Sequence, residues 1–196
     1  WERYIDYYLS RQQDMDLCYV TGETMPCSDM SPSKIRNSGD KAKLISSNDT
    51  SGFTFRGRFE SAKQVARVGY TTTQKAHNAL KWLISKQGFR NGDQVFVIWG
   101  THNEPIPPIE KDSLDMQLEA FGEQPLPDVH TEYAQRVNQM MAGYAQHLTP
   151  RSQVVIMGLD SATTGRMSII RYQELWGSDF LERLQNWYQS CVWVLD

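Results

Sequence analysis

Apolar residues recur at helical spacing in three stretches of the chain. The first stretch follows Thr73, a suitable N-cap, and ends at Gly88; the second is closed by Pro150, and the third begins after Ser178. The apolar faces consist of Ala76, Ala79, Leu80, Leu83 and Ile84 in the first stretch, Val129, Tyr133, Val137, Met140, Tyr144 and Leu148 in the second, and Phe180, Leu184, Trp187 and Cys191 in the third. This pattern predicts at least three amphipathic helices.

Short runs of β-branched and aromatic residues predict strands between these helices. The runs span residues 17–21, 43–46, 53–56, 94–99, 154–159 and 166–172. Turn-forming residues join the second run to the third and the fifth run to the sixth, so each of these pairs is predicted to form a hairpin. Because the strands and helices do not alternate as a regular βαβ repeat, we expect an α+β fold with mixed, mostly antiparallel sheet elements.

The composition is that of a folded protein without a membrane span. The chain has 196 residues, of which 40% are hydrophobic, and no apolar run approaches the ~20 residues that a spanning helix needs. Three cysteines are too few for a disulfide framework, which favours a reducing compartment and a cytoplasmic location. The first residue is Trp1 instead of Met, so we expect an internal portion of a longer chain.

Charge is distributed unevenly, although the net charge is only −3. Residues 29–75 hold nine basic side chains against four acidic ones. Residues 101–128 hold one Lys, seven carboxylates and five of the eight prolines, a composition typical of an exposed connector. We therefore expect residues 1–100, with a basic hairpin, a helix and a buried strand, to pack with residues 129–196 as one domain around an acidic connector at 101–128.

One stretch resembles a catalytic motif. Residues 99–105 read Trp-Gly-Thr-His-Asn-Glu-Pro and resemble the W-x-T-x-N-E-P signature of retaining β-glycosidases, in which Glu104 would be the acid/base and Asn103 would hold a sugar hydroxyl. That chemistry needs a second carboxylate about 5 Å away, and the barrel of those enzymes needs ~250 residues. Since no matching second Glu motif occurs, Asn103-Glu104-Pro105 is better interpreted as the start of the connector.

Other catalytic and cofactor motifs are missing from the sequence. It contains no G-x-x-x-x-G-K-S/T phosphate loop, G-x-G-x-x-G, H-E-x-x-H or G-x-S-x-G. The cysteines and the four histidines do not have metal-ligand spacing. We therefore expect neither a cofactor nor a metal, and no enzymatic activity.

The basic segment from Ser33 to Phe59 combines cations, small turn residues and aromatic residues. Cations suit phosphates, close backbone approach suits a groove, and aromatic rings can stack on or wedge between bases. The same pattern also fits a hairpin whose Phe53, Phe55 and Phe59 face the core while its arginines face solvent. Spacing alone leaves both interpretations open.

Several long strings closely resemble the large subunit of the type I-C CRISPR surveillance complex, known as Cascade. They are residues 18–23 (CYVTGE), 34–36 (KIR), 41–49 (KAKLISSND), 52–59 (GFTFRGRF), 74–84 (QKAHNALKWLI) and 159–169 (LDSATTGRMSI). The resemblance spans nearly the whole chain, although family members are longer on both sides. It departs at Ser31, where the family's His is expected before Pro32.

The resemblance implies a non-enzymatic bacterial protein of RNA-guided antiviral defence. Pairing with the guide RNA supplies most of the sequence specificity, while the large subunit helps to recognise a short duplex motif beside the target, the PAM, and to bind target DNA. The implied partners are double-stranded target DNA, the CRISPR RNA, the other Cascade subunits and a recruited helicase-nuclease.

The resemblance and the charge pattern together identify candidate nucleic-acid contacts. We expect phosphate contacts from Lys34, Arg36, Lys41, Lys43, Arg56 and Arg58, base reading by Asn48 with its neighbours Ser47, Thr50 and Gly52, and weaker candidates in Lys75, His77, Asn78, Lys81 and Arg166. Asp49 is expected to shape the turn. His77 is expected on the solvated face of its helix, and an ordinary solvated surface is the favoured interpretation of all the weaker candidates.

Two alternative functions stay open at this point. In the first, the basic segment binds the guide RNA or neighbouring subunits without reading DNA. In the second and more remote one, the chain is a glycoside hydrolase that uses Glu104.

Overall fold

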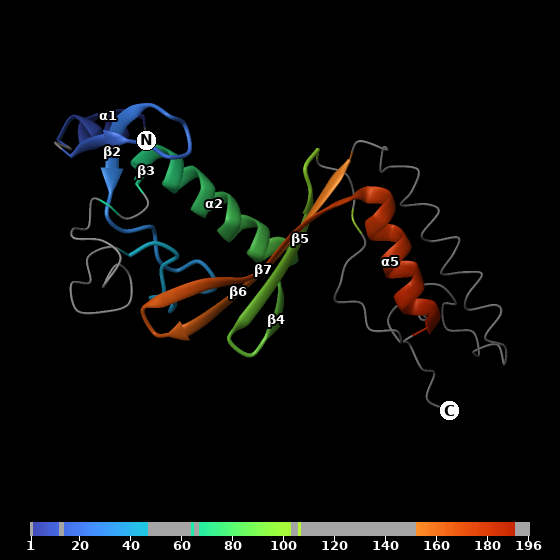
Figure 1. Cartoon of the computed structure of the whole chain (residues 1–196). Coiled ribbons are helices and arrows are strands. Elements are labelled where there is room, and N and C mark those ends of the chain that lie inside the picture. Colours follow the sequence, from blue (N-terminus) through green and yellow to red (C-terminus); the bar gives the residue numbers. More distant parts are fainter. Residues whose placement is uncertain are drawn as a thin grey trace. The chain divides into compact units, whose positions relative to one another are not determined.

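A computed structural model describes most of the chain in two compact units (Figure 1). The described residues are 2–11, 14–46, 64, 67–102, 106 and 152–190. The first unit comprises Trp1–Lys86, Asn91–Val95 and Leu159–Ile170, and the second comprises Gln87–Arg90, Phe96–Gly158 and Arg171–Asp196.

The first unit begins with α1, Glu2–Arg11, a helix that the sequence pattern did not predict. Its Tyr8 ring lies 4.7 Å, between ring centroids, from that of Tyr70, the first residue of α2. On the exposed side of α1, the Arg11 guanidinium lies 5.1 Å from the centre of the Tyr7 ring. Aromatic contacts therefore hold α1 against the start of the longer helix.

A three-stranded antiparallel sheet follows α1. Its strands, in spatial order, are β1 (Met15–Leu17), β2 (Thr24–Ser28) and β3 (Val68–Gly69). Cys27 pairs with Gly69, where a Cβ would lie 2.0 Å from the Met25 sulfur. The predicted strand at 17–21 is wrong beyond its first residue, because residues 19–21 form the turn that leads to Gly22, whose φ is +73°.

The buried side chain of Arg67 binds carboxylates that lie on or next to β1 and β2. Its side chain is only 1% exposed, and its Nε donates to Asp16 Oδ2 at 3.1 Å, while its two terminal nitrogens bond Asp14 and Asp29. Burial alone would lower the pKa of Arg67, but its hydrogen bond to Asp14 and the charges of the three carboxylates raise it above its usual value. The cation is therefore fixed in its charged form.

The helix α2, Tyr70–Gln87, confirms the predicted helix but only part of its predicted face, in which Ile84 is buried and Leu80 and Leu83 are half-buried. Thr73, His77 and Ile84 are its buried residues, whereas Ala76 and Ala79 of the predicted apolar set are exposed. The expectation that His77 lies on the solvated face is wrong, since His77 is 7% exposed. Tertiary packing has rotated the buried face away from the one that hydrophobicity alone selects.

His77 is buried with one ring nitrogen bonded within the helix. Its Nδ1 lies 2.7 Å from the Thr73 carbonyl oxygen, so Nδ1 carries the proton and donates. Its Nε2 has no hydrogen-bond partner within the part of the chain that the structure describes. Burial and the charge of Lys81 lower the pKa of His77, although the Thr73 hydrogen bond opposes them.

A four-stranded sheet contains most of the strongly predicted strands. Its strands, in spatial order, are β4 (Phe89–Asn91), β5 (Gln94–Gly100), β6 (Gln153–Thr163) and β7 (Arg166–Trp176). The buried strand at 94–99 and the pairing of 154–159 with 166–172 are confirmed, and the turn between the last two strands is only Thr164-Gly165. Core side chains on these strands include Val95, Val97 and Val154.

The helix α5, Gly177–Ser190, confirms the last predicted helix. Phe180 and Leu181 are buried, whereas Trp187 of the predicted apolar face is half exposed. With three helices and two antiparallel sheets among the described residues, the α+β fold class is confirmed. None of these helices is long and apolar enough to cross a membrane.

Three predictions fall outside the described residues. They are the helix over 129–148, the hairpin strand at 53–56 and nearly all of the acidic connector at 101–128. The expected domain division therefore stays a prediction. The expected strand at 43–46 is wrong in form, because only single bridges are made there, by Lys43 to Arg166 and by Ser46 to Met30.

Candidate nucleic-acid interface

The predicted basic segment begins in a closed loop, residues 31–46. Its base is closed by two hydrogen bonds: the Ser31 amide donates to the Ile45 carbonyl at 2.9 Å, and the Ile45 amide donates to the Ser31 hydroxyl at 3.1 Å. Met30 and Ser46 are bridged just outside them. Both ends of the loop therefore leave the same point of the fold.

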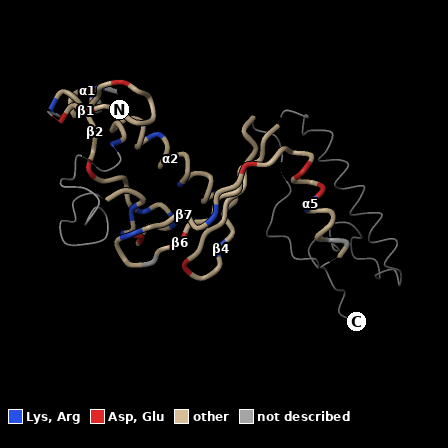
Figure 2. Tube along the Cα trace, in the orientation of Figure 1, with Lys and Arg blue, Asp and Glu red and all other residues tan. Residues whose placement is uncertain are grey.

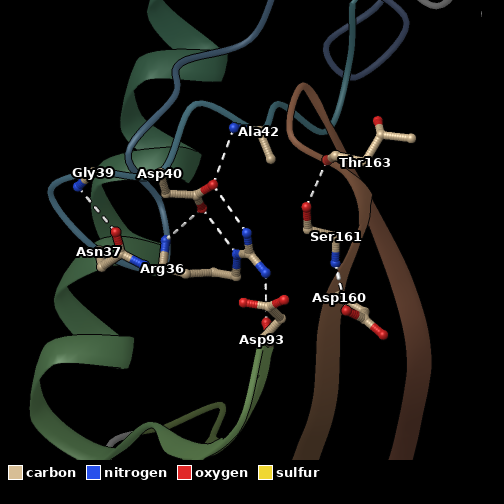
Figure 3. A network of polar contacts seen from close by, with 9 residues as sticks. All are labelled: Arg36, Asn37, Gly39, Asp40, Ala42, Asp93, Asp160, Ser161 and Thr163. Atoms are coloured by element: carbon tan, nitrogen blue, oxygen red, sulfur yellow. Dashed lines mark hydrogen bonds and ion pairs between the residues drawn. The ribbon is translucent and has the colours of Figure 1, made fainter.

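The loop is wound around the carboxylate of Asp40. Arg36 Nε donates to Asp40 Oδ2 at 2.9 Å and Arg36 Nη2 donates to Asp40 Oδ1 at 3.0 Å, while the Ala42 amide also donates to Oδ1 at 3.0 Å. The Lys34 amide closes the turn by donating to the Asp40 carbonyl at 2.8 Å. Figure 3 shows the bidentate pair and the amide that points at it.

The Arg36–Asp40 pair is buried and charged. Arg36 is 8% exposed and the Asp40 side chain is 2% exposed. Burial alone would raise the pKa of Asp40, but the hydrogen bonds from Arg36 and the Ala42 amide outweigh it and hold that pKa below its usual range. The pKa of Arg36 is correspondingly raised, mainly by its hydrogen bond to Asp40. The pair thus stays ionised at neutral pH and fixes the loop.

Segments distant in sequence tether this loop on two further sides. Arg36 Nη1 donates to the Asp93 carbonyl in the turn between β4 and β5. The Lys43 amide donates to the Gly165 carbonyl at 3.2 Å, and the Met167 amide donates to the Lys43 carbonyl at 3.0 Å. Ile35 and Ala42 bury their side chains beneath the loop. The loop is therefore part of the packed fold instead of a free connection.

Positive side chains remain on the outside of the loop. Lys34 and Lys41 are exposed, and Lys43 is half-buried with its Nζ 3.2 Å from the Met30 sulfur. Lys34 has a φ of 59°, the left-handed conformation that few non-glycine residues adopt. Arg166, half-buried, starts β7 beside Lys43. Figure 2 shows several Lys and Arg positions, in blue, near the β6 and β7 labels.

A cavity of about 610 Å³ lies between the loop and the hairpin tip. It is lined by Arg36, Asn37, Gly39, Asp40, Lys41, Asp93, Ser161, Thr163 and Thr164. The lining offers hydroxyl, amide, ammonium and carboxylate groups, which suit a polar, hydrogen-bonding ligand. The described residues contain no cluster of three His, Cys, Asp or Glu side chains that could hold a metal ion.

Two carboxylates limit how positive this surface is. Asp93 lines the cavity, and Asp160 accepts hydrogen bonds from Gln94 Nε2 at 3.0 Å and from the Ser161 amide at 2.6 Å. These two hydrogen bonds lower the pKa of Asp160, so its charge is present at neutral pH. The cations Lys34, Lys41, Lys43 and Arg166 outnumber these carboxylates, and Asp40 is balanced by Arg36.

The structure places the predicted site residues in three groups. Lys34, Arg36, Lys41, Lys43 and Arg166 lie on or beside the loop, Lys75, His77, Asn78 and Lys81 lie on α2, and Ser47, Asn48, Thr50, Gly52, Arg56 and Arg58 lie outside the described residues. Arg36 is committed to Asp40 and Asp93, so we assign it a role in holding the loop. The buried position of His77 likewise removes it from the solvent-facing candidates.

Sequence reasoning missed the residues that complete the cavity. Asp40 carries the signal of its role only in its spacing, four residues after Arg36, which is also the spacing of an ordinary helical ion pair. Asp93 lies 57 positions after Arg36 in the sequence, and Thr163 lies 127 positions after it. Only the folded chain brings the three residues to one cavity.

The lowered pKa of Asp40 predicts an acid-dependent stability. A carboxylate whose folded pKa is depressed stabilises the fold at pH values above its unfolded pKa, about 3.9, and this contribution is lost as the pH falls through the folded pKa. We expect the gap in unfolding free energy between the wild type and Asp40→Asn to be constant from pH 7 to about 5 and to shrink below about 4. Urea denaturation at each pH measures it. A gap that is independent of pH down to 2 would contradict the prediction.

Comparison with known proteins gives one match. The model of a protein family described as CRISPR-associated protein (Cas_Csd1) matches residues 1–196. No curated protein matches the chain.

Proposed function

Because this chain belongs to the Cas_Csd1 family of CRISPR-associated proteins, we propose that it binds target DNA within an RNA-guided interference complex and helps to recognise the PAM duplex. The family resemblance carried by the sequence strings is confirmed by the match. In the proposed role the chain breaks no covalent bond itself, and guide RNA pairing supplies most of the specificity.

The fixed loop 31–46 is the observation that supports this proposal. Phosphate contacts position a protein on a duplex, and they are most effective when the cations are already held in place. Lys34 and Lys41 project from a loop that Arg36 and Asp40 lock from within. Lys43 and Arg166 continue the positive surface along β7. A preorganised row of cations of this kind suits a rigid polyanion.

Base reading is assigned to the segment that follows the loop. Ser46 is bridged to Met30, so the chain leaves the loop at a fixed point immediately before Ser47 and Asn48. Short polar side chains such as these can hydrogen-bond to base edges in a groove. The polar cavity beside Lys41 lies in the same unit and offers further hydrogen-bonding groups.

The proposed partners besides target DNA are the guide RNA, the other Cascade subunits and the recruited helicase-nuclease. Contact with neighbouring subunits has its own support in exposed apolar side chains on the first unit. These side chains are Tyr4, Tyr7, Met15, Leu17, Tyr19 and Val20, each about half exposed or more. Scattered exposed apolar residues are ordinary, but this number within the first 20 residues favours a protein interface there.

A salt titration tests the proposal. We expect the triple variant Lys34→Ala/Lys41→Ala/Lys43→Ala, in the assembled complex, to bind PAM-containing duplex more weakly. Each lost phosphate contact removes about 0.9 from the slope of log affinity against log salt, so the slope should flatten by about 2 to 3. The loss should be similar for duplexes of different sequence, because phosphates carry no sequence information.

A matched variant controls for net charge. Arg3→Ala/Arg11→Ala/Arg183→Ala removes an equal number of positive charges from exposed positions that are not part of the loop, and it should leave the slope within about 0.5 of the wild type. If the loop variant and the control variant have the same slope, Lys34, Lys41 and Lys43 do not contact phosphates. Catalytic turnover by the chain alone would instead contradict the non-enzymatic role.

A further inference from the structure

The helix α2 presents a stripe of four exposed residues that its buried face does not explain. At about 100° per residue, Lys75, Trp82 and Lys86 point in nearly the same direction, with Asn78 beside them. All four are exposed. This direction is opposite to that of the buried Thr73, His77 and Ile84, so the stripe faces directly away from the core.

Trp82 is the unusual member of the stripe. Its indole is 59% exposed, although Trp is highly buried on average in folded proteins. The Trp82 backbone carbonyl accepts a hydrogen bond from the Ser85 hydroxyl at 2.8 Å, so this contact does not involve the indole. The Trp82 indole is therefore a large, flat, apolar ring that is accessible to a partner on the surface of α2.

The charge around Trp82 has a single sign. The 18 residues of α2 include Lys75, Lys81 and Lys86 and not one Asp or Glu. Lys75 and Lys86 are separated by 11 residues, which is about 16 Å along the helix axis, and Trp82 lies between them. An aromatic ring between two cations complements a strand that alternates flat bases with phosphates.

We propose that this stripe binds single-stranded nucleic acid, with one unpaired base stacked on Trp82 and phosphates on either side held by Lys75 and Lys86. The inference rests on the proposed function, because opening a target duplex supplies such a strand. A paired base cannot offer its face to the indole, since its faces are covered by neighbouring base pairs. Asn78 can add a hydrogen bond to the stacked base or its sugar.

The lysines around Trp82 also favour a nucleic acid over a protein as the partner of this stripe. A surface that docks a protein subunit is depleted of Lys at its centre, because a desolvated ammonium group needs a paired acceptor. Here the lysines flank the only large apolar side chain of the stripe and remain in solvent. The observed pattern therefore favours a polyanion whose bases supply the apolar contact.

Binding of an oligodeoxythymidylate of about 20 nucleotides by the full chain tests the inference. We expect Trp82→Ala to bind at least tenfold more weakly than the wild type, and Trp82→Phe to retain most of the affinity, since a smaller ring still stacks. An abasic backbone of the same length should bind the wild type and Trp82→Ala equally. The control Trp187→Ala, which removes a 52% exposed indole from α5, should bind thymidylate as the wild type does.

Three results would overturn the inference. They are no detectable binding of thymidylate by the wild type at 50 mM salt, equal affinities of the wild type and Trp82→Ala, or an equal loss on the abasic strand. Normal strand binding by Trp82→Ala combined with failed assembly of the complex would assign the stripe to a protein contact instead. The duplex test uses the loop lysines, so the two proposals can fail separately. If the loop variant loses duplex binding and Trp82→Ala still binds thymidylate normally, only the proposed function is supported. If Trp82→Ala loses thymidylate binding and the loop variant binds duplex normally, only the strand site is supported.

Discussion

Replacing Arg67 with Ala is expected to lower the free energy of unfolding by about 3 kcal/mol or more. The substitution removes a 1% exposed cation and deprives Asp14, Asp16 and Asp29 of the guanidinium that joins them. Breaking a buried ion pair from one side typically costs about 3 to 5 kcal/mol. We place the loss at the lower end because all three carboxylates are partly exposed and can rehydrate. Chemical denaturation followed by circular dichroism measures the change.

Two further variants make the Arg67 prediction specific. Arg67→Lys keeps the charge but cannot reach three carboxylates with a planar fork, so it should recover only part of the loss. Arg11→Ala removes an exposed guanidinium that lies over Tyr7, and it should change stability by less than about 1 kcal/mol. Equal stabilities of Arg67→Ala and Arg11→Ala would show that the carboxylate cage does not hold the strands together.

Replacing Arg36 with Met is expected to cost about 3 kcal/mol and to weaken DNA binding, although Arg36 is not proposed to touch DNA. The variant leaves the Asp40 carboxylate buried without its cation and detaches the loop from the Asp93 carbonyl. Lys34 and Lys41 then lose the fixed positions on which their phosphate contacts depend. Unfolding experiments and duplex titrations on the same variant measure both losses.

A double substitution separates the ion pair from the packing at this site. Arg36→Met/Asp40→Leu removes both charges together, and it should be more stable than Arg36→Met alone because no unpaired charge stays buried. Lys41→Met, an exposed change in the same loop, should lower stability by less than about 0.5 kcal/mol. If Arg36→Met and Lys41→Met are equally stable, the buried pair does not determine the loop.

The sequence pattern predicted the elements whose signal is local. The strands β5 and β6 are dense in β-branched residues, so their buried positions can be inferred without knowing their neighbours, whereas Ile169 and Ile170 of β7 are about half exposed. The short strand β2 contains Pro26 and only five residues, and β3 has two, so neither carries a usable periodicity. These strands exist because Arg67 and the pairing of Cys27 with Gly69 hold them.

The orientation of α2 shows why faces are harder to predict than helices. Hydrophobicity selects Ala76 and Ala79, but alanine gains little from burial, and the fold buries Thr73 and His77 instead. The contacts of His77 Nδ1 with the Thr73 hydroxyl and carbonyl satisfy one of the two ring nitrogens inside the helix. Trp82 was not part of the predicted apolar set, and its indole is 59% exposed in the structure.

The basic side chains of the described loop have two different roles in the structure. Of the cations in the described loop, Arg36 is used to hold the structure, while Lys34 and Lys41 face solvent. The sequence cannot separate these uses, because the partner that withdraws Arg36 from the surface includes the carbonyl of a residue 57 positions later.

The bridge between Lys43 and Arg166 has a consequence for how the protein is made. Residues separated by more than 120 positions must meet before the loop is complete, and the hairpin that supplies one wall of the cavity is synthesised near the end of this chain. At about 5 to 20 residues per second, the ribosome takes several seconds to extend the chain from Lys43 to Met167. During that interval the nascent loop lacks its late partner, so this surface is complete only after the β6–β7 hairpin has been synthesised.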